Sequence, residues 1–384
     1  MDSGIDNVEI RDFALGQGLD NSPELIGSPE QPLLTVVVFP WERFSVSPLA
    51  LDSLLENTTI PYKLVYVDGN SPAHIRDQIK QKLAGRPQTT LLRYEHYLRP
   101  IQARNIGVQR VDTPYVALVA NDVYLYPGAL QAMLRCAVEE KADAVTPVVL
   151  IGSPDTTTIH SAGGSVTLFK KDGQTWLKND QKHEWQSLTT LTGELKREPA
   201  ALAELHCWLA KTDSLRRTGD AEGNSDILTH TFSQWDFGLI HQKLGMRMFF
   251  EPSAVTVYMS PFGLGTKAYD LPYFFTVWSE KLAGGALYAL AEKHGISPSW
   301  PHKSYILHWV GAHRRIPLDP VMDGTKAFFK ALGVPKAGVA AQKLVYQPSE
   351  ILFNNLFMAT VNPLARSISK AEKRDQFLQP VQSL

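Results

Sequence analysis

The stretch that decides the fold is ARNIGVQRVDTPYVALVANDV, residues 103–123. It joins a helical segment to an uninterrupted apolar run, Tyr115 to Val119, which stops at Asn121 and Asp122. A short apolar run bounded by turn residues is typical of a buried strand in a parallel sheet. Open α/β sheets bind their ligands beyond the carboxyl ends of such strands. Asp122 is therefore the first candidate for a functional carboxylate.

The segments around this stretch alternate between strands and helices. β-branched runs predict the strands, and apolar residues at helical spacing predict the helices between them. The expected strands are 33–39, 63–67, 89–94, 115–119 and 144–150. The expected helices are 48–57, 72–83, 101–110 and 128–140. This order predicts an α/β fold with a Rossmann-like, doubly wound, mostly parallel sheet flanked by helices.

The chain divides into three expected parts. Residues 1–31 are rich in Gly, Ser, Pro, Asp and Asn without any period, which predicts an N-terminal arm. Residues 32–265 are the expected sheet domain, with a loop-rich insertion at 152–200 that carries one hairpin. Two more strands and a helix complete this domain: 205–210, 247–250 and 231–244. Residues 266–384 are expected to be a mostly helical extension that packs on the domain and contains one amphipathic helix at 273–294.

Composition excludes several classes of protein. With 384 residues, 44% of them hydrophobic, the chain can bury a large core. A net charge of −1 argues against a nucleic-acid partner. Cys136 and Cys207 have no paired spacing and are expected to be buried thiols in a reducing compartment. The acidic N-terminus is unlike a signal peptide, and the longest apolar segment of the C-terminal half is too short to span a bilayer. We expect a cytoplasmic protein, either free or peripheral to the inner face of a membrane.

Asp68 and Asp122 each end an expected strand. Asp68 precedes Gly69, and two interpretations of this pair are open. Asp68 can accept hydrogen bonds from the base or ribose of a nucleotide, or the two residues can simply form an Asp-Gly turn. Asp122 suits either ligand binding or a cap for the helix that begins after Pro127. Two carboxylates at one sheet edge are costly unless a cation or hydrogen-bond donors face them. The oxygens of Asn121 and Asp122 are the ligand type preferred by Mg²⁺, and also suit Mn²⁺ between two phosphates.

Three further residues are candidates for chemistry. Arg104 precedes the Asp122 strand by one helix and can pair with a phosphate or form a structural ion pair. Asp236 lies beside Trp235 in a helical pattern, where a partly desolvated carboxylate can act as a general base and a solvated one has no special role. Trp41 follows Pro40 at the end of the first strand, where it suits either base stacking or the core.

Other chemical signals are weak. The eleven histidines include no close metal-binding spacing, so His160, His206, His241 and His308 are expected to be ordinary polar or core residues. No glycine-rich phosphate loop followed by lysine occurs near the first strand, which disfavours a nucleotidyltransferase.

The order of these segments from Leu33 to Pro261 resembles the family 2 glycosyltransferases with the GT-A fold. The Ser161–Gly164 segment is similar to one in rhamnosyltransferase-like members. By this resemblance Asp122 is the second aspartate of an Asp-x-Asp motif that binds a divalent cation, Mg²⁺ or Mn²⁺. Asp236 corresponds to the catalytic base of inverting members. The residues implied to bind the nucleotide-diphosphate sugar donor are Pro40, Asp68, Arg104, Asn121 and Asp122.

Three positions depart from the family pattern. Ala120 replaces the first aspartate of the motif, Trp235 replaces the glutamate before the base, and Tyr258 stands where many members have a metal-binding histidine. A neutral phenol is a poor ligand for a hard cation. A cation would therefore rely on Asp122, diphosphate oxygens and water.

The leading hypothesis is an inverting, metal-dependent glycosyltransferase that moves a hexosyl or deoxyhexosyl group to a hydroxyl of a glycan, a lipid or another acceptor, as in polysaccharide or glycolipid biosynthesis. The alternative is a relative that binds nucleotide sugars or glycans without catalysis.

Overall fold

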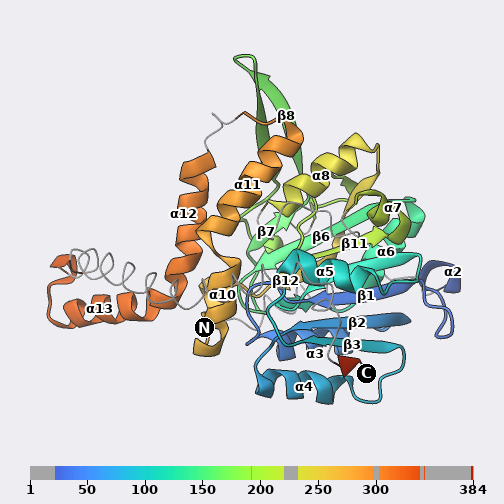
Figure 1. The fold of residues 1–384 in the computed structure, drawn as a ribbon, viewed down its shortest axis with the longest axis horizontal. Coiled ribbons are helices and arrows are strands. Elements are labelled where there is room, and N and C mark those ends of the chain that lie inside the picture. Colours follow the sequence, from blue (N-terminus) through green and yellow to red (C-terminus); the bar gives the residue numbers. More distant parts are fainter. Residues whose placement is uncertain are drawn as a thin grey trace.

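The computed structural model describes residues 22–191, 193–219, 232–297, 302–337, 341 and 382–383. Its centre is an 11-stranded sheet with the order β10-β12-β6-β11-β4-β1-β2-β3-β13, in which β5 also pairs with β12 and β7 with β6 (Figure 1). The first four strands are β1 Leu34–Phe39, β2 Tyr62–Gly69, β3 Thr89–Tyr94 and β4 Tyr115–Ala120. The others are β5 Val123–Leu125, β6 Ala144–Ile151, β7 Ile159–Ala162, β10 Glu198–Pro199, β11 Cys207–Lys211, β12 Met248–Tyr258 and β13 Gln382–Ser383.

The strands β3, β2, β1 and β4 form a continuous parallel unit. The chain runs from β1 outward through β2 and β3 and then returns to pair β4 with the other side of β1. Beyond β4, β11 is antiparallel to both of its neighbours, and β6 and β12 are again parallel. The expected α/β class with a mostly parallel, helix-flanked sheet is confirmed. The direction of winding reverses between β1 and β4, which is where such sheets form a ligand crevice.

Helices connect and cover the strands of this unit. They are α3 Ser47–Asn57, α4 Ala73–Leu83, α5 Pro100–Val108 and α6 Ala129–Glu139. All six residues of β1 are buried, as its unbroken apolar run requires. α5 lies close to this strand because Gly107 has no side chain. A Cβ at Gly107 would lie 2.2 Å from Cγ1 of Val37 and 3.3 Å from Cγ2 of Val67.

The insertion after β6 carries the predicted hairpin, formed by β8 Gly164–Lys171 and β9 Gln174–Gln181. Two helices follow β11: α7 Thr212–Arg217 and α8 Ser233–Lys243. β12 is longer than the expected strand 247–250, because it continues past Pro252 through a register shift between Glu251 and Val255. A proline is tolerated in a strand at such an irregularity.

The described part of residues 266–384 is largely helical, with α10 Leu271–Val277, α11 Glu280–His294, α12 His302–Arg315 and α13 Asp319–Ala331 after the short α9 Pro261–Leu264. The prediction of one helix over 273–294 is wrong. α10 ends at Val277, and α11 begins after Ser279, whose hydroxyl accepts a hydrogen bond from the backbone N–H of Leu282 at 3.5 Å. α11 and α12 lie side by side (Figure 1).

The ends of the chain are described only in part. The first 21 residues of the expected N-terminal arm lie outside the described residues, and its remainder contains the one-turn helix α2 Pro23–Ile26. Among the described residues, no helix combines the length and apolar character needed to cross a membrane.

Candidate active site

The carboxyl edge of β4, β1 and β2 brings four predicted residues together. β1 ends level with β4, and β2 pairs with the other side of β1. Pro40 directly follows β1, Asn121 and Asp122 directly follow β4, and Asp68 is the last residue but one of β2. Asn121 links β4 to the segment after β1. Its side-chain oxygen accepts a hydrogen bond from Trp41 N–H at 2.8 Å, and its amide nitrogen lies 2.7 Å from the hydroxyl of Ser47.

Asp68 and Arg104 are buried at or near this edge. One oxygen of Asp68 accepts a hydrogen bond from Ser71 N–H at 2.9 Å, and the other accepts one from the guanidinium of Arg93 at 2.7 Å. Arg104 lies on α5, with its guanidinium 3.5 Å from the side-chain oxygen of Asn105. Asp68 thus has hydrogen-bond partners within the protein, and with Gly69 it forms the end of β2.

Asp122 is fully buried between β4 and β5. No other residue in the described part of the chain donates a hydrogen bond to either of its carboxylate oxygens. Burial and the nearby carboxylate of Glu42 raise the pKa of Asp122 to about 7, against the opposing effect of His206 and Arg43. The site therefore contains a buried carboxylate with a neighbouring like charge and little compensation.

Glu42 connects this carboxylate to the C-terminal helices. The hydroxyl of Tyr258 donates to one oxygen of Glu42 at 2.6 Å, and the indole N–H of Trp278 donates to the other at 2.8 Å. Burial raises the pKa of Glu42, and it raises that of Tyr258 well above the ordinary value of 10. The phenol of Tyr258 is therefore a hydrogen-bond donor here. Its ring also stacks on the imidazole of His206, with 3.9 Å between ring centroids.

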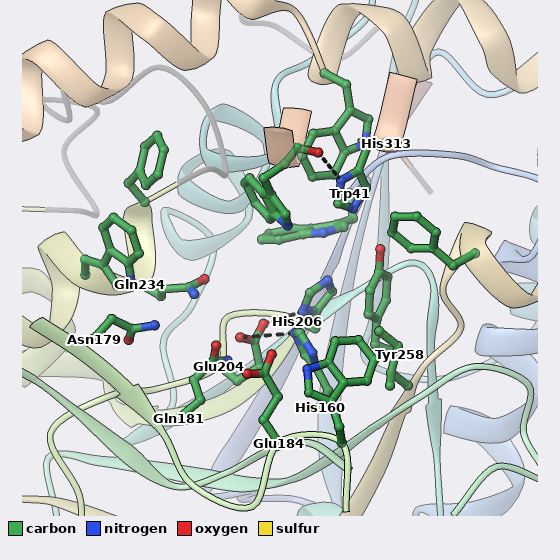
Figure 2. A pocket seen from close by; sticks show the side chains of 17 residues that line it. Trp41, His160, Asn179, Gln181, Glu184, Glu204, His206, Gln234, Tyr258 and His313 are labelled. Carbon is green, nitrogen blue, oxygen red and sulfur yellow. Dashed lines mark hydrogen bonds and ion pairs between the residues drawn. The ribbon is translucent and has the colours of Figure 1, made fainter. Parts of the chain in front are cut away.

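A cavity of about 270 Å³ opens beside this cluster (Figure 2). Figure 2 shows Gln234 and Asn179 on one side of it and Tyr258 on the other. Its walls come from β7, the β8–β9 hairpin, α8 and the C-terminal helices. Most of the lining is aromatic: Trp41, His160, Trp185, His206, Phe232, Trp235, Tyr258, Phe262, Trp278, Trp309 and His313. Such a surface suits a ligand that presents apolar faces as well as polar groups.

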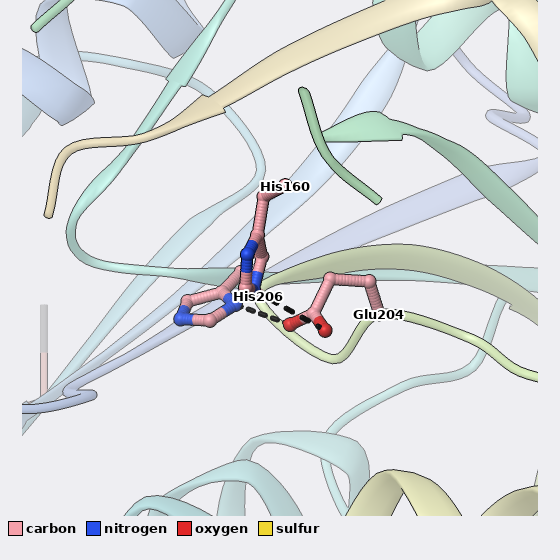
Figure 3. Close-up of side chains that lie close together, drawn as sticks. All are labelled: His160, Glu204 and His206. Atoms are coloured by element: carbon pink, nitrogen blue, oxygen red, sulfur yellow. Dashed lines mark hydrogen bonds and ion pairs between the residues drawn. The ribbon is translucent and has the colours of Figure 1, made fainter. Parts of the chain in front are cut away.

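Three polar residues gather at the wall of this cavity (Figure 3). Glu204 shares a hydrogen bond with Nδ1 of His206, and its second oxygen lies 3.7 Å from Nε2 of His160. Burial opposes charge on His206, but the Glu204 carboxylate outweighs it and raises the pKa of the imidazole. Burial lowers the pKa of His160. The sequence prediction that both histidines are ordinary residues missed this cluster, since only the pairing of β7 and β11 with β6 brings them together.

Asp236 lies on α8 and faces α11 instead of the cavity. Its two oxygens contact Nζ of Lys293 at 2.9 Å and Nε2 of His294 at 2.7 Å. Gln234 and Trp235, immediately before it, do line the cavity. The aspartate is buried and ion-paired, so it is not the solvated carboxylate of the alternative prediction.

Residues 43–203 match the sequence model of glycosyl transferase family 2. The match includes Asp68, Arg104, Asn121 and Asp122, and it confirms the predicted family resemblance over this segment. No protein of curated function matches the sequence.

Two solved structures resemble the chain weakly. GalNAc-T7 with UDP, GalNAc and Mn²⁺ aligns with a TM-score of 0.45 at 11% identity over 73% of this chain, which spans 57% of that protein. The mannosyltransferase PcManGT from Pyrobaculum calidifontis, in complex with GDP-Man and Mn²⁺, aligns with a TM-score of 0.43 at 15% identity, covering 96% of this chain and 94% of that one. Similarity this low carries no argument about the substrates of this chain.

Proposed function

We propose that the protein is an inverting glycosyltransferase that moves a hexosyl or deoxyhexosyl group from a nucleotide-diphosphate sugar to the hydroxyl of a glycan or lipid acceptor. The main support is Asp122. It lies at the switch point of the sheet, within the segment that matches family 2, and its buried carboxylate receives no hydrogen bond from the other described residues. A buried carboxylate of this kind is typical of a functional position.

A divalent cation fits the residues around Asp122. Carboxylate oxygens are the preferred ligands of Mg²⁺, and they also suit Mn²⁺. The negative charge of Glu42 raises the pKa of Asp122, and a bound cation would offset this repulsion between the two carboxylates. When bound, the cation would stabilise the charge that develops on the departing diphosphate.

The donor would bind along the edge formed by Pro40, Asp68 and Arg104. These residues are covered in the present conformation. The hydroxyl of Tyr273 on α10 donates to the carbonyl of Leu98 at 2.9 Å and lies 3.4 Å from that of Pro40. We propose that α10 moves away from this edge when the donor binds.

The acceptor would occupy the aromatic cavity. Indole and phenyl rings offer flat apolar surfaces against which the C–H faces of a sugar ring can pack, and Asn179, Gln181 and Gln234 supply hydrogen-bonding groups. Asp236 is the proposed base by family resemblance. Its ion pair with Lys293 and His294 must open for it to reach an acceptor hydroxyl.

Calorimetric titration with UDP, dTDP and GDP, each with and without Mn²⁺, tests the proposal. We expect one nucleotide to bind in a metal-dependent way and Asp122→Ala to lose that binding. The second candidate function, a non-catalytic relative, is favoured by the burial of the proposed donor residues. Absence of nucleotide binding under every condition would contradict the transferase and support a relative that binds glycans without catalysis.

A further inference from the structure

We propose that His160, Glu204 and His206 form a binding site for a zinc-type divalent cation, separate from the cation proposed at Asp122. One ligand atom from each of the three residues lies within 4.8 Å of the others. Two imidazoles and a carboxylate are an established ligand set for zinc. The proposal does not depend on glycosyl transfer.

The spacing is close to what a tetrahedral ion needs. Zinc–nitrogen and zinc–oxygen bonds of about 2.0–2.1 Å place neighbouring ligands roughly 3.3 Å apart. Nε2 of His160 lies 3.7 Å from the nearer oxygen of Glu204, so a small approach is enough. His206 and Glu204 are already in hydrogen-bond contact and would separate slightly to admit the ion.

The three side chains are held by the same part of the sheet. His160 lies on β7, and His206 immediately precedes β11. Because β12 pairs with β6 over the whole of Ala144–Ile151, β7 and β11 both pair with the opposite edge of β6, one after the other. The backbone N–H of Glu204 hydrogen-bonds to the hydroxyl of Thr146 on β6 at 3.3 Å. β6 therefore fixes all three positions, and rigid placement of ligands favours metal binding.

Burial of the carboxylate beside two imidazoles is the second observation that favours an ion here. The Glu204 side chain is 2% exposed and that of His206 is 8% exposed. Nδ1 of His160 and Nε2 of His206 are both buried, and neither has a hydrogen-bond partner within the described residues. These are the ring nitrogens opposite the two that face Glu204, so Nε2 of His160 and Nδ1 of His206 are the candidate ligand atoms.

The proposed site faces the aromatic cavity, since all three residues line it (Figure 2). Three protein ligands leave a fourth coordination position, as in zinc sites that bind water or substrate. That position would take an oxygen, such as a hydroxyl or carboxylate, from a molecule in the cavity. Imidazole ligands favour borderline metals, whereas the oxygens near Asp122 favour hard ones, so the two sites would differ in metal preference.

Metal titration of the full chain tests the proposal. The protein is dialysed against a chelator and titrated with Zn²⁺ and, separately, Mg²⁺ by calorimetry, without nucleotide. We expect one zinc per chain and a loss of affinity of roughly 100-fold or more in both His206→Gln and His160→Gln. Two variants should keep zinc binding: Asp122→Asn, at the other proposed site, and His74→Gln, which removes an exposed histidine.

Zinc binding that is absent in the unmodified protein, or that keeps the affinity of the unmodified protein in both ligand variants, would overturn the proposal. Circular dichroism establishes that each variant is folded. The unmodified protein also provides a test that needs no substitution, because Co²⁺ in a four-coordinate site should give a visible absorption band that Zn²⁺ removes. Neither readout involves sugar transfer. A negative transferase assay would therefore not contradict the zinc site, and a negative zinc titration would not contradict the proposed transferase activity.

Discussion

Replacing Asp122 with asparagine should stabilise the folded protein while removing the proposed cation ligand. The carboxyl group is fully buried, and burial together with Glu42 raises its pKa from 3.8 to about 7. In the folded state Asp122 therefore keeps its proton over a pH range in which the unfolded chain has already released it. Asparagine has nearly the same shape and carries no charge, so it avoids this cost.

The expected magnitude follows from the pKa difference. About three pKa units at 1.36 kcal/mol each correspond to about 4 kcal/mol. Below pH 4 both states are protonated and Asp122 costs nothing. As pH rises from 4 to 7 the unfolded state loses its proton first, so the free energy of unfolding should fall by about 1.4 kcal/mol per pH unit relative to the variant. Above pH 7 both states are ionised and the gap should stay constant.

Urea denaturation followed by tryptophan fluorescence, with a chelator present, measures this gap at several pH values between 4 and 8. Asp112→Asn is the matched control, because the Asp112 side chain is 66% exposed and pairs with Lys63 at the surface. Its stability should change little at any pH. A gap for Asp122→Asn that does not depend on pH, or a variant less stable than the parent protein at pH 8, would refute the reasoning.

Three further outcomes are expected. Because Asp122 must be ionised to hold a cation, Mn²⁺ affinity measured by calorimetry should fall about tenfold from pH 8 to pH 6. An affinity that does not change with pH would show that Asp122 is not a ligand of the cation. Asp236→Asn should abolish sugar transfer and leave nucleotide binding unchanged. Lys293→Gln breaks the same ion pair but keeps the carboxylate, so this variant should retain transfer. Equal transfer activity in both variants would show that Asp236 is not the base. Gly107→Ala should lower the free energy of unfolding by about 3 kcal/mol in urea, since its methyl group would overlap Val37, and an unchanged midpoint would contradict the close helix packing.

The first half of the fold could be predicted because its signals are local. Val116 to Val119 are buried as an unbroken apolar segment, and the end of this strand places Asp122 at the sheet edge. β12 was predicted too short because Glu251 and Pro252 are typical of a strand end. Only the pairing with β6 carries that strand beyond them.

The environment of Asp122 could not be read from the sequence, because its neighbours come from distant segments. Glu42 follows β1, His206 precedes β11, and Tyr258 ends β12. Glu42 and His206 are unremarkable among their own sequence neighbours and follow no short metal-binding spacing, and only the family resemblance points to Tyr258. Their interaction depends on β1, β11 and β12 ending close together, which is a property of the whole sheet order.

The segments after the sheet also contribute side chains to the surroundings of Asp122. Trp278 donates a hydrogen bond to Glu42, and its ring stacks on His313 of α12 with 3.6 Å between centroids. Tyr258 and both of these residues lie outside the segment that matches family 2. Burial is the largest cause of the raised pKa of Asp122, and Glu42 is the next. Because Tyr258 and Trp278 hold Glu42 in place, the charge state of a carboxylate inside the family segment depends on residues outside it.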